Sequence, residues 1–201
     1  MLNLRPVVGR VVGPLAARLL RLGITPDMVT VAGTVGAVAG SLALLARGHF
    51  FWGSVVVTLS VLTDALDGTM ARMRGASTRW GAFLDSTMDR IADASVFSAL
   101  VIWYAGRGGS LVLLCVALFC LVAGVLTSYI KARAEGLGMT CNVGIAERTE
   151  RLILVLAGTG LAGLGLPIGL PIMLWVLAVL SAVTVGQRLV EVRRQASRSA
   201  G

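Results

Sequence analysis

The sequence has few charged residues, few aromatic residues and few cysteines. Only 14% of its 201 residues are charged and 5% are aromatic, whereas 56% are hydrophobic. A soluble domain needs more polar groups to cover its surface, so this composition excludes an ordinary soluble protein. The three cysteines are scattered, and there is neither a glycine period nor a polar tract, which excludes disulfide-stapled, collagen-like and disordered chains. We therefore expect one membrane domain over residues 1–201.

Acidic residues are also scarce, because 10 Asp and Glu stand against 18 Lys and Arg, for a formal net charge of +8. Nucleic-acid binding would require a basic soluble face, and the sequence offers none, so we expect no nucleic-acid partner. Basic loops that contact anionic lipid headgroups account for the charge of a membrane protein.

Apolar segments of helical length predict an all-α polytopic protein with six transmembrane helices. A juxtamembrane helix is expected over residues 1–24, where Arg10, Arg18 and Arg21 lie opposite an apolar face, as in amphipathic helices at a membrane interface. The bundle is expected over residues 25–190, and a cytoplasmic tail over residues 191–201. The spans are expected at residues 25–45, 50–73, 80–105, 111–134, 148–164 and 167–190.

The first span opens with a helix start signal. In Thr25-Pro26-Asp27, threonine can cap the helix, proline suits its first position and aspartate suits its first turn. Further along, Gly33, Gly36 and Gly40 have the small-xxx-small spacing that lets a neighbouring helix approach closely. Packing is the expected role of these glycines.

The basic residues predict the orientation in the plasma membrane. Only Arg47 and Arg107 fall in the expected outer loops, and Arg90 falls inside the third span. The other 15 lie in segments that we assign to the cytoplasm: Arg5, Arg10, Arg18, Arg21, Arg72, Arg74, Arg79, Lys131, Arg133, Arg148, Arg151, Arg188, Arg193, Arg194 and Arg198. The positive-inside rule then places both termini in the cytoplasm.

Five aspartates lie within otherwise apolar helices, where a charge is costly and therefore indicates function. Asp64 and Asp67 are three residues apart and share one helix face, and Asp85 and Asp89 are four apart and share another. The connection between the two helices, Arg74–Arg79, is short, so we expect the four carboxylates to meet near the cytoplasmic end. Asp93 extends the acidic face by one turn and is expected to support the site or to pair with Arg90.

Four carboxylates at such a site require a compensating cation. Oxygen ligands without histidine or cysteine favour Mg²⁺ or Mn²⁺ over zinc. Ion pairs with the neighbouring arginines, Arg72, Arg74, Arg79 and Arg90, are the structural alternative. Acids, metal and arginines together suit phosphoryl transfer, with one carboxylate accepting the proton of an attacking hydroxyl. A divalent-cation transporter is an alternative of another class, although arginines beside the acids would repel cations.

The order of these residues resembles the signature of the CDP-alcohol phosphotransferase family. The pattern is Asp64-x2-Asp67-Gly68-x2-Ala71-Arg72-x8-Gly81-x3-Asp85-x3-Asp89, in which every fixed position matches. The resemblance extends over nearly the whole chain. TPDMVT from Thr25, SYIKARAEG from Ser128 and ERTERL from Glu147 are similar to actinobacterial members that make phosphatidylinositol phosphate, although Thr149 stands where we expect proline.

The resemblance implies a homodimeric membrane enzyme with a cavity open to the cytoplasm. Asp64, Asp67, Asp85 and Asp89 would bind two Mg²⁺ ions, and Asp89 would also be the general base. A hydroxyl of inositol phosphate would attack the lipid-proximal phosphate of CDP-diacylglycerol and release CMP. The residues implied in binding CDP-diacylglycerol are Asp27, Met28, Val29, Thr30, Gly68, Arg72 and Thr78. Helix capping is an equally good explanation for Asp27 and Thr30.

The acceptor is expected to be a phosphorylated alcohol. Lys131, Arg133, Arg151 and Arg188 lie at the cytoplasmic ends of the last three spans, where they could converge on a second anion. In the family, such residues are associated with the phosphate of inositol phosphate. Glycerol 3-phosphate is the alternative acceptor and would make the protein a phosphatidylglycerophosphate synthase. Positive-inside anchoring is the alternative explanation for these cations.

Overall fold

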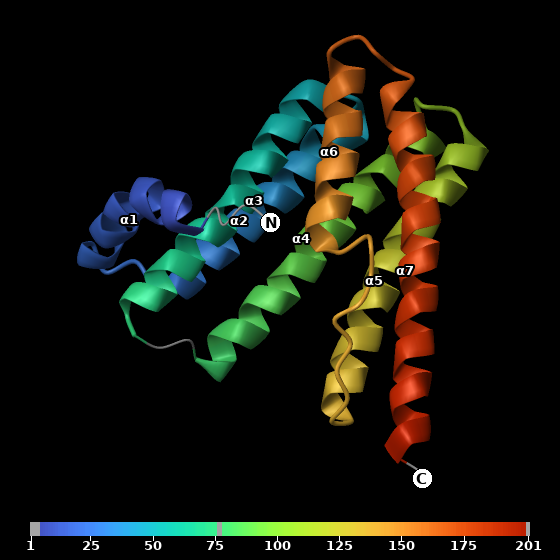
Figure 1. Ribbon diagram of the computed structural model, residues 1–201. Coiled ribbons are helices and arrows are strands. Elements are labelled where there is room, and N and C mark those ends of the chain that lie inside the picture. The colour runs from blue at the N-terminus through green and yellow to red at the C-terminus, as the bar shows by residue number, and fades with distance from the viewer. Residues whose placement is uncertain (1–4, 76–77, 200–201) are drawn as a thin grey trace.

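The computed structural model describes residues 5–75 and 78–199, and the side chains of residues 12–75 and 78–198. All regular elements within these ranges are helical, which confirms the all-α class (Figure 1). In chain order they are α1 (Arg5–Arg21), α2 (Pro26–Ala43), the 3-10 helix η1 (Leu45–Arg47), α3 (Phe50–Met73), α4 (Arg79–Ala105), α5 (Leu111–Gly136), α6 (Arg148–Gly163) and α7 (Gly169–Ser199).

The helices α2 to α6 follow the expected segments to within a few residues. At the start of α2, the hydroxyl of Thr25 accepts a hydrogen bond from the backbone N–H of Met28 at 3.2 Å, and Pro26 is the first helical residue. This confirms the predicted helix start. The last helix differs, because the expected boundary between bundle and tail at residue 190 lies inside α7, which continues to Ser199. No proline or glycine follows Gly186 until residue 201, so the chain carries no signal that would end the helix earlier.

Four stretches are long and apolar enough to cross a membrane: Pro26–Arg47, Phe50–Met73, Leu111–Gly136 and Gly169–Arg198. The remaining two helices of the bundle fall short of this standard for different physical reasons. α4 carries Asp85, Asp89, Arg90 and Asp93 in its first half, and α6 has only 16 residues. A membrane-embedded helical protein is therefore supported, whereas six spans stay a prediction.

The glycines of α2 allow α3 to approach closely, as their spacing predicted. A Cβ atom on Gly33 would lie 2.0 Å from Oγ1 of Thr63, and one on Gly36 would lie 2.6 Å from Oγ of Ser60. A Cβ on Gly40 would lie 2.7 Å from a methyl carbon of Val56. Larger side chains at these three positions would force the two helices apart.

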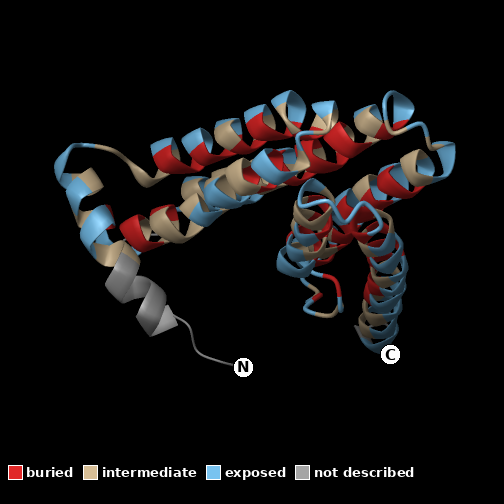
Figure 2. Cartoon of the chain, turned by 90° about the horizontal axis from the view of Figure 1, so that it is seen from above, coloured by how far each residue is buried: buried red, intermediate tan, exposed pale blue. Residues whose placement is uncertain are grey.

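The order of packing differs from the expected pairing of α3 with α4. Both helices pack against α2, and neither packs extensively against the other, although they are consecutive in the chain. α5 packs against α4 and α7, and α6 packs against α3 and α7. Buried residues follow these contact faces (Figure 2). α2 therefore lies between the two acidic helices and sets the distance between them.

The N-terminal helix α1 lies at an angle to the other helices (Figures 1 and 2). Its Ala16 is fully buried against Val29 and Met70, whereas Leu15, and Leu22 directly after the helix, are more than half exposed. The side chain of Arg10 lies outside the described residues. A position of α1 at the membrane interface stays a prediction.

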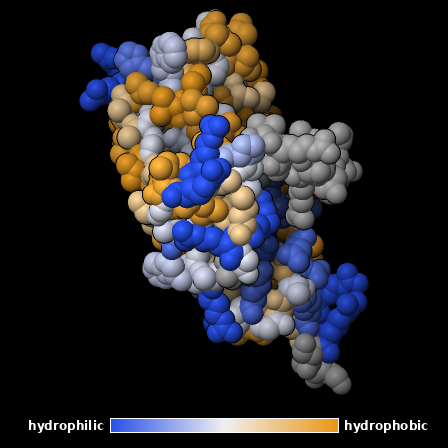
Figure 3. All heavy atoms as spheres, turned by 90° about the vertical axis from the view of Figure 1, so that its left-hand side faces the viewer, coloured by the Kyte–Doolittle hydropathy of each residue, from blue (hydrophilic) through white to orange (hydrophobic). Residues whose placement is uncertain are grey.

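The connection between α3 and α4, the connection between α5 and α6 and the C-terminal end of α7 all lie toward one end of the molecule (Figure 1). From this end the loop of residues 137–147 runs back along α5, so that α6 begins partway along the bundle. The face seen in Figure 3 is mostly hydrophobic over its upper part, and hydrophilic residues gather toward its lower end.

Candidate active site

Two acidic residues on α3 and two on α4 form the first part of the site. Asp67 is buried, Asp64 and Asp89 are half-buried, and Asp85 is exposed. One acid from each helix reaches a shared cation, because Asp64 and Asp89 lie 2.9 Å and 2.8 Å from the Arg148 guanidinium. Acids from the two helices thus meet although α3 and α4 do not pack directly against each other, because both helices pack against α2.

The guanidinium of Arg148, the first residue of α6, lies among these acids. Its Nη1 is 2.9 Å from Oδ2 of Asp64, and its Nη2 is 2.8 Å from Oδ1 of Asp89. Its Nε is 3.2 Å from Oδ1 of Asp93. Sequence reasoning placed Arg148 only in the count of cytoplasmic cations. The available signal was its place in the ERTERL stretch beside Arg151, a stretch used only for the family resemblance.

The four carboxylates fit a hard divalent cation by their chemistry, since they offer only oxygen donors and carry excess negative charge. In the part of the chain that the structure describes, no three acidic, histidine or cysteine side chains already form a group that could hold an ion. Arg148 supplies the positive charge between Asp64 and Asp89 instead. The donor set therefore fits Mg²⁺ or Mn²⁺, with Arg148 as the competing cation.

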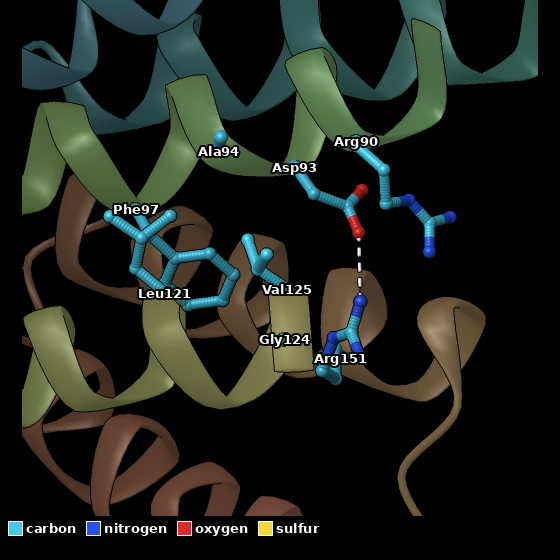
Figure 4. Close-up of a pocket in the computed structure, with 8 residues that line it drawn as sticks. All are labelled: Arg90, Asp93, Ala94, Phe97, Leu121, Gly124, Val125 and Arg151. Carbon is cyan, nitrogen blue, oxygen red and sulfur yellow. Dashed lines mark hydrogen bonds and ion pairs between the residues drawn. The ribbon is translucent and has the colours of Figure 1, made fainter. Parts of the chain in front are cut away.

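Asp93 pairs with two arginines, and neither of them is Arg90. Its Oδ2 is 2.9 Å from Nη2 of Arg151 (Figure 4). Its Oδ1 accepts a hydrogen bond from Nε of Arg148. The expected pairing of Asp93 with Arg90 is wrong. Nη2 of Arg90 instead lies 3.5 Å from Oδ2 of Asp89, and Nη1 of Arg90 donates to the hydroxyl of Ser128. The cause is tertiary, because α6 brings two cations to Asp93 that the α4 sequence cannot indicate.

The small pocket of Figure 4 lies behind Asp93, between α4, α5 and α6. Phe97, Leu121 and Val125 line its apolar side. The Nε atoms of Arg90 and Arg151 are buried in the structure without a hydrogen-bond partner. The pair of Asp93 and Arg151 is thus held in surroundings that exclude most solvent, which fixes the Asp93 carboxylate in one position.

The residues assigned to CDP-diacylglycerol lie on α2, on α3 and at the start of α4. Thr30 donates to Oδ2 of Asp67 at 2.5 Å, which links α2 to the acidic face of α3. The hydroxyl of Thr78 accepts from the backbone N–H of Gly81 at 2.9 Å and so caps α4. Oδ1 of Asp27 would lie 3.8 Å from a Cβ atom on Gly81, so Asp27 sits beside the start of α4.

The remaining residues of this set differ in their surroundings. A Cβ atom on Gly68 would meet only Nη1 of Arg72, at 3.6 Å, so there is open space beside this glycine. The Arg72 guanidinium donates to Thr69 at 2.9 Å. Val29 is buried in the cluster with Ala16, whereas Met28 is 57% exposed.

Helix capping does not explain Asp27 or Thr30. The capping side chain of α2 is that of Thr25, and the Thr30 hydroxyl bonds to Asp67 and to the backbone oxygen of Pro26. Asp27 lies in the first turn, where its negative charge interacts favourably with the positive end of the helix dipole. Of the two explanations held open for these residues, capping by their side chains is therefore excluded.

A cavity of about 690 Å³ opens next to Asp89 and is lined by α4, α5, α6 and α7. Lys131, Arg148, Arg151 and Arg188 all belong to its lining. Arg133 is exposed and does not line it. The structure thus brings three of the four cations expected at the acceptor site to one cavity and leaves the fourth outside.

These cations are held to different degrees. Arg188 is 5% exposed and donates to the backbone oxygens of Thr127 at 2.6 Å and Val143 at 2.9 Å. Arg151 is 3% exposed and donates to Oγ1 of Thr127 at 2.9 Å. The Lys131 side chain has weaker contacts than these two arginines, because its Nζ lies 4.0 Å from Oε1 of Glu135. Of the three expected acceptor cations that line the cavity, the two guanidiniums are therefore firmly held, and the Lys131 ammonium is less constrained.

Comparison with known proteins places the chain in a family. Residues 23–187 match the sequence profile described as CDP-alcohol phosphatidyltransferase. A phosphatidylinositol phosphate synthase of Streptomyces avermitilis is 49% identical over 197 residues, which covers 94% of this chain and 81% of the relative. One of Mycobacterium marinum is 50% identical over 188 residues, with 92% and 80% covered.

Solved structures agree with the sequence relatives. A crystal structure of Mycobacterium tuberculosis phosphatidylinositol phosphate synthase with CDP-DAG bound has a TM-score of 0.88 and 47% identity, covering 91% of this chain and 94% of that one. A second structure of that enzyme, in complex with manganese and citrate, has a TM-score of 0.85, with 90% and 88% covered.

Proposed function

The chain belongs to the CDP-alcohol phosphatidyltransferase family, and we propose that it transfers the phosphatidyl group of CDP-diacylglycerol to a hydroxyl of inositol phosphate. The hydroxyl oxygen would bond to the phosphorus next to diacylglycerol, and the bond from that phosphorus to the oxygen of CMP would break. The observation that carries the proposal is a single cavity with Asp89 on one wall and Lys131, Arg151 and Arg188 on the others. Such a cavity suits an acceptor that has both a hydroxyl and a phosphate.

Metal ions are part of the proposal. Asp64, Asp67, Asp85 and Asp89 would hold two Mg²⁺ ions, for which Mn²⁺ could substitute, and their charge would stabilise the negative charge that develops on the phosphate oxygens. The manganese complex of the solved relative supports this part.

Asp89 is proposed as the group that accepts the proton of the attacking hydroxyl. It lines the cavity, whereas Asp67 on the neighbouring helix is buried and bonded to Thr30. Nη2 of Arg148 and Nη2 of Arg90 contact different oxygens of the Asp89 carboxylate, at 2.8 Å and 3.5 Å. A carboxylate in this position can orient a hydroxyl and remove its proton.

The donor is proposed to bind along α2, α3 and the start of α4. A Cβ atom on Gly68 would meet only the Arg72 guanidinium, so this glycine would let a nucleotide approach the α3 backbone, and Asp27, Thr30, Arg72 and Thr78 lie on or next to the same three helices. Arg72 can accompany a diphosphate because guanidinium groups pair well with phosphate oxygens. Met28 and Val29 would contribute through the α2 backbone that carries Asp27 and Thr30.

The acceptor phosphate is proposed to lie against Lys131, Arg151 and Arg188. Two of these cations are fixed by protein partners, so they form a preorganised positive surface, and the Lys131 ammonium can move toward an anion. Arg133 does not line the cavity, so the proposal gives it no direct contact with the acceptor phosphate.

The placement in the cell is also proposed rather than observed. We propose six spans in the plasma membrane, with both termini and the cavity on the cytoplasmic side. The α3–α4 and α5–α6 connections, which the sequence assigns to the cytoplasm, lie toward the same end of the bundle, and this supports the orientation. The homodimer implied by the family resemblance stays a prediction.

The test is CMP release from CDP-diacylglycerol by purified full-length protein in detergent with Mg²⁺. Inositol phosphate, free inositol and glycerol 3-phosphate are compared as acceptors. Release with inositol phosphate alone supports the proposal. Release only with glycerol 3-phosphate would move the protein to phosphatidylglycerophosphate synthesis, and metal uptake into liposomes without CMP release would support a cation transporter.

A further inference from the structure

We propose that Arg148 is an exchangeable counter-ion of the carboxylate cluster, which competes with divalent cations for Asp64 and Asp89 and remains attached to Asp93 when it is displaced. The inference rests on the proposed function in one respect, the binding of a divalent cation by these acids. It adds a role for an arginine that the metal, donor and acceptor sets do not include.

The first observation is that one guanidinium uses three nitrogens on three carboxylates. The contacts of Arg148 to Asp64 and Asp89 measure 2.9 Å and 2.8 Å, the short range of charge-assisted hydrogen bonds. Both carboxylates belong to the set that fits a divalent cation. A divalent cation bound by Asp64 and Asp89 would lie close to the like charge of this guanidinium and draw on the same two carboxylates, so binding of one weakens binding of the other.

The second observation is that the third contact is independent of the cluster. Asp93 is 7% exposed and is held from its other oxygen by Arg151, which is itself bonded to Thr127. The Asp93 carboxylate therefore keeps its position whether or not Asp64 and Asp89 bind Arg148. Through its Nε, Arg148 keeps an anchor when its two terminal nitrogens are released.

The third observation is that Arg148 borders the cavity, so its two terminal nitrogens can turn toward the cavity once Asp64 and Asp89 release them. Arg148 lines the cavity together with Lys131, Arg151 and Arg188. Its positive charge would then add to the surface that faces an anionic substrate. One side chain would in this way stabilise the acids before the metal binds and favour anions in the cavity afterwards.

The experiment measures Mn²⁺ binding rather than turnover. Full-length protein in detergent is freed of metal with a chelator, and free Mn²⁺ is followed by electron paramagnetic resonance during titration. We expect Arg148→Gln to bind Mn²⁺ about tenfold more tightly than the unaltered protein, in the range of coupling between groups in direct contact. Without metal its melting temperature should be lower than that of the unaltered protein, and saturating Mn²⁺ should narrow the difference.

The matched control is Arg90→Gln. Arg90 is also a cation beside Asp89, at 3.5 Å, but it has no ion pair with Asp64. A gain in Mn²⁺ affinity as large as that of Arg148→Gln would show that general charge repulsion is responsible and would overturn the proposal. Arg148→Lys keeps the charge but places it on one nitrogen, which does not reproduce the three separate contacts of the guanidinium, so we expect an intermediate gain. This variant also serves if the glutamine variant does not fold.

Two further outcomes separate this inference from the proposed function. If the unaltered protein binds Mn²⁺ and releases CMP, but Arg148→Gln binds the ion equally or more weakly, Arg148 is a structural bridge and only the inference is wrong. If no form of the protein binds Mn²⁺, the metal-dependent function and the inference are both wrong.

Discussion

The acidic and the cationic sides of the candidate site are built in different ways. Asp64, Asp67, Asp85 and Asp89 come from two helices that are consecutive in the chain, and their spacing follows the helical repeat. The cations Lys131, Arg151 and Arg188 come from three helices, and two of them are buried against backbone and side-chain oxygens. The acidic side is therefore defined locally, whereas the cationic side depends on how α5, α6 and α7 pack.

The comparison teaches that similar residues can have different tasks. An arginine such as Arg148 compensates the acids, Arg151 holds Asp93, and Arg188 joins the loop of residues 137–147 to α7. Nothing in the residue type distinguishes these tasks. Substitutions on the two sides should therefore affect activity, stability and acceptor binding to different extents.

The largest effect is expected on the acidic side. Asp89→Asn removes the proposed base and an oxygen donor with little change in volume, so we expect kcat for CMP release to fall about 10³-fold or more. Glu135→Gln is a suitable control, because it also neutralises a carboxylate at the cavity. The Glu135 carboxylate is not part of the acidic side, and its ion-pair partner is Lys131, at 4.0 Å. Near-normal turnover of the asparagine variant would remove Asp89 from the chemistry.

A smaller effect, on stability, is expected where the two sides meet. Arg151→Gln leaves the buried Asp93 with Arg148 as its only partner, so the free energy of unfolding should fall by about 3 kcal/mol. Thermal unfolding in detergent measures the loss. The double variant with Asp93→Asn should recover part of it, and an equal or greater loss in the double variant would contradict the pairing.

An effect on acceptor binding is expected from substitution of Lys131, the less constrained cation of the cavity. Lys131→Gln should raise KM for the phosphorylated acceptor about tenfold, the value of one charge-assisted hydrogen bond, and should leave KM for CDP-diacylglycerol unchanged. Arg133→Gln, two residues away on the same helix but outside the cavity, is the control. If both variants have equal effects, the cations act only through general charge.

The smallest effect is expected at the cap of α2. Thr25→Ala removes the hydrogen bond to the N–H of Met28 and should cost about 1 kcal/mol of unfolding free energy. Asp27→Asn, in the same turn, should instead raise KM for CDP-diacylglycerol. A donor KM that changes with Thr25 but not with Asp27 would reverse the roles proposed for the two residues.

The site could be predicted from the sequence only in part. The residues of the acidic side were found because a charge in an apolar helix is costly and the helical repeat places them on one face. The meeting of all four stays a prediction, since Arg148 joins only Asp64 and Asp89, and the expected pairing of α3 with α4 is wrong because both helices pack on α2. The glycines of α2 indicated a close helix contact but not that α3 would be the partner.

Sequence by itself determined the helix starts, the lengths of α2 to α6 and the acidic face, because each depends on side chains within a few turns of one helix. Only the tertiary structure decided that Arg148 lies among Asp64, Asp89 and Asp93, that Arg151 holds Asp93, and that Arg133 stays outside the cavity. These outcomes depend on the packing of helices that are distant in the chain. The helical repeat shows which residues share a face, but it carries no information about which other helix that face will meet.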